Sequence, residues 1–337
     1  MKLIEETRAE NLPPEWDTII GDNLYLRRSF LTFIEKTEKD YKPTYYLFFD
    51  GDKADSCFVA HERKGYNLAM FTKFNFKICV TMIYLPMCVT RSGVVFGKCK
   101  NAVIEKIKSL KGYKMILNLS EEEQKEGFKD FAIGLTCPKC VLGLRFDSFD
   151  DYVNSLRSDY RNRLKKVLKK TEDINIRFID NKTDFSDALY QMYLNVLGKS
   201  RVRIETLSKE YFQGDMFKVF VAEKEGRAIG FIQLLENGSE LIFEFVGIDY
   251  KYNDELPIYH RMLFEIIRYG IENGFKTIDF GQTADDTKLK LGSDYIRLYA
   301  ALHHSAGIMR FFSKRLAPYI EYKPLNMNFR VFKEEKE

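Results

Sequence analysis

The second half of the sequence contains an order of strand and helix patterns that few folds share. Three runs rich in β-branched and aromatic residues lie at about 217–223, 228–235 and 240–247. Short turns that contain glycine separate them, which predicts an antiparallel meander. A helical pattern at about 257–272 and a strand at 276–280 follow, and a crossover helix of this kind lets two strands pair in parallel. The expected fold class is therefore α+β, with mixed, mostly antiparallel sheets flanked by helices, and not a doubly wound sheet.

The first part of the chain has a similar mixed pattern. Aromatic strand residues at 45–49, a turn at Gly51 and a second apolar run at 57–60 predict a β-hairpin. Apolar residues recur at helical spacing from Val103 to Leu110, and a buried strand is expected at 115–119. The second part begins with a short strand pattern at 174–179 and a helix pattern at 184–197, before the meander.

One long basic helix is expected to join the two parts. Ser148 followed by Asp151 is typical of a helix N-terminus, and an apolar stripe extends from Phe149 to Leu168. The opposite face is rich in Arg and Lys, including Arg161. We therefore expect an N-terminal domain at 1–145, an interdomain basic helix at 146–171 and a C-terminal domain at 172–337.

Charge and cysteine content limit the function classes. Of 337 residues, 53 are Lys or Arg and 49 are Asp or Glu, so the net charge is only +4 and a globally basic nucleic-acid binder is not expected. The acidic N-terminus lacks a secretory signal pattern, and the longest apolar run is too short to span a membrane. Six scattered cysteines favour reduced thiols and a cytoplasmic location. The Cys137–Cys140 pair has no second pair of metal ligands, so no metal is expected.

Three segments resemble one known family. Residues 146–166 (FDSFDDYVNSLRSDYRNRLKK) are similar to its interdomain helix, and 274–293 (GFKTIDFGQTADDTKLKLGS) to its last strand and following loop. The segment from Trp16 to Phe33 is similar to its opening. The family is that of the FemAB-like proteins, tandem-GNAT (acyl-CoA N-acyltransferase) relatives of the peptidoglycan-bridge aminoacyltransferases. The resemblance implies two GNAT-like domains and acyl transfer to an amine.

The sequence departs from the GNAT pattern at the donor-binding turn. GNAT proteins that bind acyl-CoA have glycines there, whose backbone N–H groups approach the pyrophosphate. Here the turn is Tyr252–Ile258, with Leu256 and Ile258 at the glycine positions, and Pro257 removes one N–H donor. The resemblance still assigns Asn253, Leu256, Pro257 and Ile258 to donor binding. FemAB-like proteins often lack the glycines, and their bridge-forming members use aminoacyl-tRNA.

The strand at 242–248 is expected to carry the reaction. In the GNAT fold two central strands separate, which would leave backbone groups of Phe245, Val246 and Gly247 free to bind the donor; we expect the separation after Gly247. Glu244 lies between two phenylalanines, and by strand alternation it faces away from both rings. A carboxylate beside aromatic rings can have a raised pKa and act as a general base. The alternative is a solvent-facing glutamate on a half-exposed sheet.

Further candidates come from the FemAB-like pattern. Asp279 ends the last strand, where it either orients substrate or accepts loop N–H bonds. Tyr295 is a candidate acid for the leaving group or a core residue. Gln282, Lys288 and Arg161 are assigned to substrate binding, and the two cations are alternatively solvated surface charges.

The predicted function is N-acyl transfer by direct attack of an amine, with no covalent enzyme intermediate. The donor is either acyl-CoA, which the superfamily favours, or aminoacyl-tRNA, which the missing glycines favour. The acceptor is expected to be a small molecule or a cell-envelope precursor with an amine. The first alternative is a catalytically degenerate GNAT that binds an envelope precursor, a nucleotide or a protein. A second alternative is RNA binding through the helix at 157–170.

Overall fold

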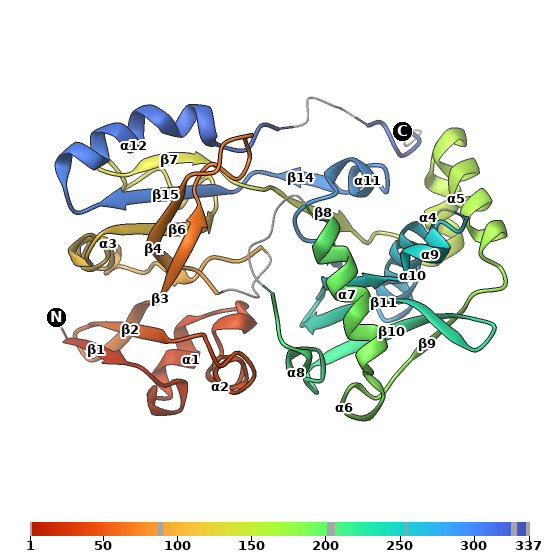
Figure 1. Cartoon of the computed structure of the whole chain (residues 1–337), viewed down its shortest axis with the longest axis horizontal. Helices are drawn as coiled ribbons and strands as arrows, with labels where there is room; N and C mark the ends of the chain where they lie inside the picture. The colour runs from red at the N-terminus through yellow and green to blue at the C-terminus, as the bar shows by residue number, and fades with distance from the viewer. Residues whose placement is uncertain (1, 86–89, 201–205, 254, 325–328, 335–337) are drawn as a thin grey trace. The chain divides into compact units, whose positions relative to one another are not determined.

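The computed structural model describes residues 2–85, 90–200, 206–253, 255–324 and 329–334, and its ribbon is shown in Figure 1. The described residues form two compact units. Unit 1 is built from residues of 1–138 and 297–324, and unit 2 from residues of 139–296 and 325–337. Each unit has its own sheet and its own core.

Unit 1 contains an eight-stranded sheet with the order β1-β2-β3-β4-β6-β15-β7. The strands are β1 (Lys2–Glu6), β2 (Pro43–Asp50), β3 (Lys53–Asn67), β4 (Lys77–Ile83), β6 (Tyr113–Leu119), β7 (Ala132–Leu135) and β15 (Tyr299–His304), with β5 (Val94–Val95) paired to β3. The main helices are α1 (Glu15–Ile19), α2 (Arg28–Thr37), α3 (Lys100–Ser109) and α12 (Gly307–Ile320). The predicted hairpin at 45–60 and the helix before Leu110 are confirmed.

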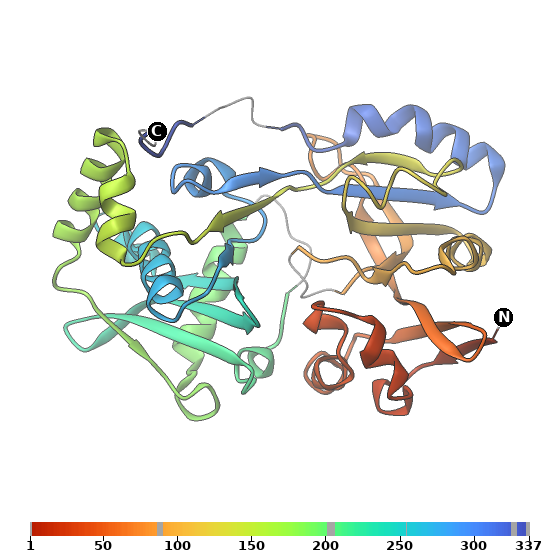
Figure 2. The ribbon, with the colours of Figure 1, turned by 180° about the vertical axis from the view of Figure 1, so that it is seen from behind.

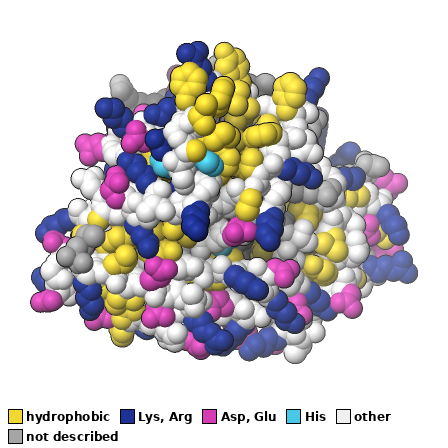
Figure 3. Space-filling view, turned by 60° about the vertical axis from the view of Figure 1, so that its left-hand side comes forward, with side chains coloured by type: hydrophobic (Ala, Val, Ile, Leu, Met, Phe, Trp, Pro, Cys, Tyr) yellow, Lys and Arg dark blue, Asp and Glu magenta, His cyan; other side chains and the backbone are white. Residues whose placement is uncertain are grey.

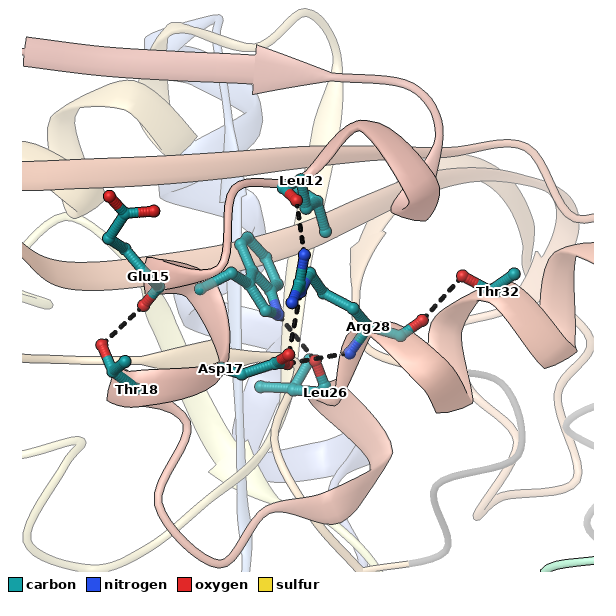
Figure 4. A network of polar contacts seen from close by, with 8 residues as sticks. Leu12, Glu15, Asp17, Thr18, Leu26, Arg28 and Thr32 are labelled. Atoms are coloured by element: carbon teal, nitrogen blue, oxygen red, sulfur yellow. Dashed lines mark hydrogen bonds and ion pairs between the residues drawn. The ribbon is translucent and has the colours of Figure 1, made fainter.

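A polar network fixes the N-terminal segment of unit 1 (Figure 4). The buried Trp16 indole donates to the Leu26 carbonyl at 2.6 Å. Arg28 donates to the Leu12 carbonyl at 3.0 Å and forms an ion pair of 2.8 Å with Asp17. These bonds connect α1 and the segment before it to the start of α2, because each joins residues at least ten positions apart in the sequence.

Unit 2 contains a seven-stranded sheet with the order β14-β8-β13-β12-β11-β10-β9. The strands are β8 (Lys139–Gly143), β9 (Asn175–Phe178), β10 (Phe217–Lys224), β11 (Arg227–Asn237), β12 (Glu240–Ile248), β13 (Thr277–Asp279) and β14 (Asp294–Ile296). The helices are α4 (Phe149–Ser155), α5 (Ser158–Lys170), α6 (Asn181–Asp184), α7 (Asp187–Lys199), α8 (Lys209–Phe212), α9 (Tyr250–Asn253), α10 (Ile258–Glu272) and α11 (Asp285–Leu289). The predicted meander, crossover helix and parallel strand are confirmed.

Both units share one pattern that the sequence alone did not reveal. Each has four antiparallel strands, a crossover helix and a parallel strand, which is β6 after α3 in unit 1 and β13 after α10 in unit 2. Beside that parallel strand each sheet then takes an antiparallel strand from the other half of the sequence. Unit 2 takes β8, and unit 1 takes β15.

This exchange of strands changes the domain boundaries. The boundaries expected at 145 and 171 assigned everything after 171 to one domain, whereas residues 297–324 belong to unit 1. The reason is backbone pairing, because β15 forms hydrogen-bonded ladders with β6 and β7. Residues 139–145, which were expected in the N-terminal domain, belong to unit 2, because β8 pairs with β13 and β14.

The single basic helix expected at 146–171 is two helices. Ser148 caps α4 by accepting the Asp151 N–H at 3.1 Å, as predicted. The backbone then becomes extended at Leu156 and Arg157, where Leu156 bridges to Phe332 and the Arg157 N–H donates to the Val331 carbonyl. This pairing with a C-terminal segment interrupts the helix before α5 starts.

Helices cover both faces of the sheet in unit 2. Figure 1 shows α7 in front of the sheet, and Figure 2 shows α10 in front when the molecule is seen from behind. Seven residues of α10 are buried, including Met262, Ile266 and Ile267. No described helix is long and apolar enough to cross a membrane.

Close packing of α7 on the sheet requires a small residue at position 247. A Cβ added to Gly247 would lie 2.1 Å from the Phe231 ring and 2.9 Å from the Tyr193 backbone nitrogen. Neither neighbour is the end of a flexible chain, so the clash cannot be relieved cheaply. Gly247 therefore has a structural role in addition to its place on the predicted reactive strand.

We expect Gly247→Ala to destabilise the protein by about 1–3 kcal/mol, because overpacking forces the ring and helix to shift. Denaturant unfolding measures this change. Gly143→Ala is the matched control, since it also lies on a strand of unit 2 and its added Cβ would meet no atom within 4 Å. Equal stability of the two variants would contradict the assignment.

Candidate functional site

The strands β12 and β13 separate early. Their parallel pairing consists of Glu240 with Thr277, Leu241 with Ile278, and Ile242 with Asp279. β12 continues to Ile248 in contact with β11, whereas the Phe280 N–H donates to the Cys140 carbonyl of β8 at 2.9 Å. Beyond Ile242 the β13 side of β12 thus has no strand partner among the described elements, and we call this edge, residues 243–247, the strand gap. Separation was expected after Gly247; it begins five residues earlier.

A β-bulge lies in the strand gap. Gln233 pairs with Phe245 and Leu234 with Phe243, so Glu244 is one extra residue on β12. The bulge breaks the alternation assumed from the sequence. Phe243 belongs to the core that α10 covers, whereas the Phe245 ring contacts Tyr193, Tyr211 and Phe212. The prediction that both rings lie on one face, opposite Glu244, is therefore wrong.

Buried charge in unit 2 is concentrated beside this gap. Among the described residues of unit 2, the buried Asp, Glu, Lys and Arg side chains are Glu244, Asp279, Asp285 and Lys288. All four lie on β12 or in the segment 279–288. Burying a charge is costly, so clustered buried charges are typical of functional sites.

Asp279 is fully buried and holds the turn after β13. One carboxylate oxygen accepts the Gly281 N–H at 2.8 Å, and the other lies 3.8 Å from the Lys139 amine of β8. Both roles that the sequence left open are compatible with this geometry. The bond to Gly281 is structural, and the charge lies where β12 and β13 separate.

Lys288 is the buried cation of this group. Its side chain is 2% exposed, its amine donates to the Gln282 carbonyl at 2.7 Å, and it lies 6.0 Å from the centre of the Phe243 ring. The ammonium therefore lies near the side chain of Phe243, the first residue of the strand gap. The solvated-lysine alternative does not fit this burial.

The loop that Lys288 holds has an unusual backbone. Thr283 and Ala284 have φ angles of 65° and 54°, a left-handed conformation that costs free energy for residues other than glycine. Ala284 is the N-cap of α11, and Gln282 accepts the Lys288 bond through its backbone. Strained loops of this kind persist where surrounding contacts fix them, and they are frequent at functional sites.

Cys140 and Tyr295 lie on neighbouring strands at this site. They are register partners on β8 and β14, and Tyr295 packs against the core of unit 2. Burial raises the pKa of the Cys140 thiol to about 12, with Lys288 lowering it and Asp285 and Asp279 raising it. A protonated thiol is a poor nucleophile. Cys137 belongs to unit 1 and both cysteines are free thiols, so this pair is divided between the units.

In the predicted donor turn, the residues at the two glycine positions pack against the core of unit 2. Ile258 is buried in the core with Leu256 packed against it, and the Ile258 N–H donates to the Leu256 carbonyl at 2.8 Å. That N–H is therefore not available to a pyrophosphate. Pro257 precedes α10 without a side-chain cap, and the side chain of Asn253 lies outside the described part of the structure.

A basic cavity of about 420 Å³ lies beside this turn. Its basic lining consists of Arg163, Lys166 and Lys170 of α5, His260 of α10 and Lys290 directly after α11, with Pro257 just before α10. Desolvation at the cavity wall and the charge of Lys290 lower the His260 pKa. Asp286 also lines the cavity, but it pairs with Lys290 at 2.6 Å. Arg161 is half-buried on α5 and does not line this cavity.

The sequence analysis missed two features of the site. Gln233 is fully buried on β11 opposite Phe245, and neither end of its amide has a hydrogen-bond partner among the described residues. A single polar residue within the apolar run from Phe231 to Leu235 was the available signal. The second feature is the contribution of His260 and Lys290 to the cavity, which depends on tertiary packing. Among the described residues, no group of three potential metal ligands gathers.

Comparison with known proteins agrees with this fold. Residues 154–289 match the family model of the acetyltransferase (GNAT) domain. The crystal structure of FemX has a TM-score of 0.56 at 10% identity and covers 93% of this chain and 100% of its own. L-PGS from Bacillus licheniformis has a TM-score of 0.50 at 12% identity, with 85% of this chain and 95% of its own covered. A conserved protein of unknown function from Bacteroides thetaiotaomicron has a TM-score of 0.53 at 10% identity, with 86% and 96% covered. No curated protein sequence matches significantly.

Two substitutions at Asp279 separate its structural role from its charge. We expect Asp279→Asn to keep the bond to the Gly281 N–H, because an amide oxygen also accepts, and to change stability little. Asp279→Ala leaves that buried N–H without its acceptor and is expected to cost about 1–3 kcal/mol. Denaturant unfolding of both variants tests this. Equal losses would show that the charge, and not the hydrogen bond, stabilises the turn.

Proposed function

We propose, for a chain that carries a GNAT domain within a FemX-like fold, that the strand gap of unit 2 transfers an activated acyl or aminoacyl group to an amine. The single observation that supports this proposal best is that a β12 edge with no strand partner among the described elements coincides with a buried ammonium. Backbone groups of Phe245, Val246 and Gly247 on that edge would bind the donor's acyl arm. Lys288 lies where the reacting carbonyl would enter.

The reaction requires a hydrogen-bond donor to the oxyanion, a base for the amine proton and an acid for the leaving group. The site has a candidate for each. The amine nitrogen attacks the donor carbonyl carbon, and the new oxyanion needs a hydrogen-bond donor. Lys288 is the candidate, because it is a buried cationic hydrogen-bond donor that the Gln282 carbonyl orients. As the C–N bond forms, the amine gives a proton to Glu244. The C–S or C–O bond of the donor then breaks, and Tyr295 protonates the departing oxygen or sulfur.

Asp279 and Gln282 shape this site without taking part in the bond changes. Asp279 holds Gly281 at the point where the chain stops pairing with β12 and remains bonded to β8. Gln282 then presents the carbonyl that orients Lys288. In this proposal both act as positioning residues.

The donor turn favours aminoacyl-tRNA over acyl-CoA. The Ile258 N–H is already bonded and Leu256 is packed against the core, so the α10 turn lacks the backbone cradle for a pyrophosphate. The basic cavity lined by Arg163, Lys166 and Lys170 suits the phosphates of an RNA end. Acyl-CoA is the second candidate, because the matched family model is an acetyltransferase domain. The acceptor is an amine of a small molecule or of a cell-envelope precursor.

Lys288→Met tests the site. We expect kcat to fall on the order of 100-fold or more, because removal of one oxyanion donor has effects of that size. Lys276→Met, an exposed lysine just before β13, is the matched control and should keep full activity. Single-turnover transfer from aminoacyl-tRNA, and from acyl-CoA in parallel, to a panel of amines is the assay. Unchanged turnover in Lys288→Met would refute the proposed site, and binding without turnover by the unmodified protein would favour the degenerate binding module.

Ligand-induced thermal stabilisation distinguishes the donors. We expect aminoacyl-tRNA to raise the unfolding temperature and acyl-CoA at millimolar concentration to leave it unchanged. Arg163→Gln with Lys166→Gln should weaken RNA binding and reduce its salt dependence by about two phosphate contacts. Lys165→Gln with Lys169→Gln is the control, since both residues are exposed on α5 outside the cavity. Stabilisation by acyl-CoA alone would reverse the choice of donor.

A further inference from the structure

The outer face of α12 in unit 1 is apolar and exposed. Five large side chains lie on it at helical spacing, with exposed fractions from 48% to 75%: Ile308, Phe311, Phe312, Leu316 and Tyr319. Figure 3 shows hydrophobic side chains gathered at the top of the molecule, with Lys and Arg side chains beside them. Exposed apolar patches of this kind usually mark an interaction surface.

The helix packs with its small residues inward. Ser313 is the buried residue of α12, and its hydroxyl donates to the Met309 carbonyl at 2.8 Å. Ser313 and Ala317 line the space between the helix and the sheet of unit 1. The helix therefore turns its largest apolar residues away from the core, which is the reverse of an ordinary surface helix. Burial within the unit does not account for these side chains.

A neighbouring loop also presents exposed aromatic side chains together with lysines. Between β3 and β4, Phe74 and Phe76 are 76% and 50% exposed, and Lys73 and Lys77 accompany them. The loop lies beside the end of α12, because the Phe71 ring packs 5.3 Å from that of Tyr322. Residues 63–78 contain no Asp or Glu. Two separate segments of unit 1 thus present aromatic rings together with lysines.

The charges around the apolar face of α12 indicate which kind of partner it binds. α12 contains Arg310, Lys314 and Arg315 and no acidic residue. The nearby carboxylates of Asp130 and Glu321 are already paired, with Lys108 at 3.3 Å and Lys323 at 3.6 Å. A second copy of the chain would bring the same basic residues against these and would be repelled. An anionic lipid surface complements both the charges and the rings, since aromatic and basic residues favour the membrane interface.

We propose that α12 and the loop at 73–77 dock unit 1 onto an anionic membrane surface. The helix lies in the plane of the interface, its aromatic side chains enter the headgroup region and its basic side chains contact lipid phosphates. Neither contribution suffices alone, because stable attachment of a peripheral protein generally requires two signals. The proposal concerns a surface of unit 1 and is independent of the function proposed for unit 2.

Co-sedimentation of the full chain with vesicles tests this inference. We expect binding to vesicles of phosphatidylcholine with phosphatidylglycerol, little binding to phosphatidylcholine alone, and weaker binding at high salt. Lys314→Gln with Arg315→Gln should weaken binding roughly 25-fold, from about fivefold per charge. Phe311→Ser with Leu316→Ser should weaken it at least as much. Thermal unfolding should change little in both variants, because all four residues are exposed and the bond from the Lys314 amine to the Lys129 carbonyl lies at the surface.

Two matched controls locate the effect. Lys165→Gln with Lys169→Gln removes two charges from another exposed basic helix, and Leu3→Ser with Ile296→Ser removes two exposed apolar side chains elsewhere. Both should bind vesicles as the unmodified protein does. Equal binding to neutral and anionic vesicles, or equal losses in the controls, would overturn the proposal. A dimer in analytical ultracentrifugation that Phe311→Ser abolishes would also overturn it and assign the face to a second copy.

Discussion

The early end of the pairing between β12 and β13 is the constraint on which the rest of unit 2 depends. Only three residue pairs form before the carboxylate of Asp279 accepts the Gly281 N–H; beyond them the chain stays bonded to β8 on its other edge but no longer pairs with β12. A longer ladder would cover the edge of β12 and leave no room for a substrate carbonyl. The bulge at Glu244 is tolerated at the same point, since that edge has no second partner strand to hold its register.

The exchange of strands between the two halves of the sequence supports this geometry. β8 precedes α4 in the chain, yet it provides the Cys140 carbonyl that receives Phe280 and the lysine that approaches Asp279. The turn after β13 is thus built by two segments that lie about 140 residues apart. The sheet of unit 2 can be complete only when β8 has joined it, so contacts of high sequence separation must form before the site exists.

The sequence predicted what depends on local pattern and missed what depends on distant pairing. Alternation and turn glycines suffice to predict β10, β11 and β12, and the Ser148 cap predicts the start of α4. By contrast, β8, β14 and β15 are short strands whose partners lie far away in the sequence. The bulge at Glu244 needs the register of β11, which no local pattern contains. Lys288 and Asp279 were found through family resemblance, whereas Gln233 became visible only through its burial.

The buried charges beside the strand gap cost stability. Glu244, Asp279, Asp285 and Lys288 each lose hydration on folding, and apolar residues of similar size would avoid that cost. The left-handed backbone at Thr283 and Ala284 adds strain in the same loop. A structure selected only for stability would not place these features together. Their coincidence beside the strand gap fits the site that we propose, in which an ammonium and a carboxylate would already be desolvated before substrate arrives.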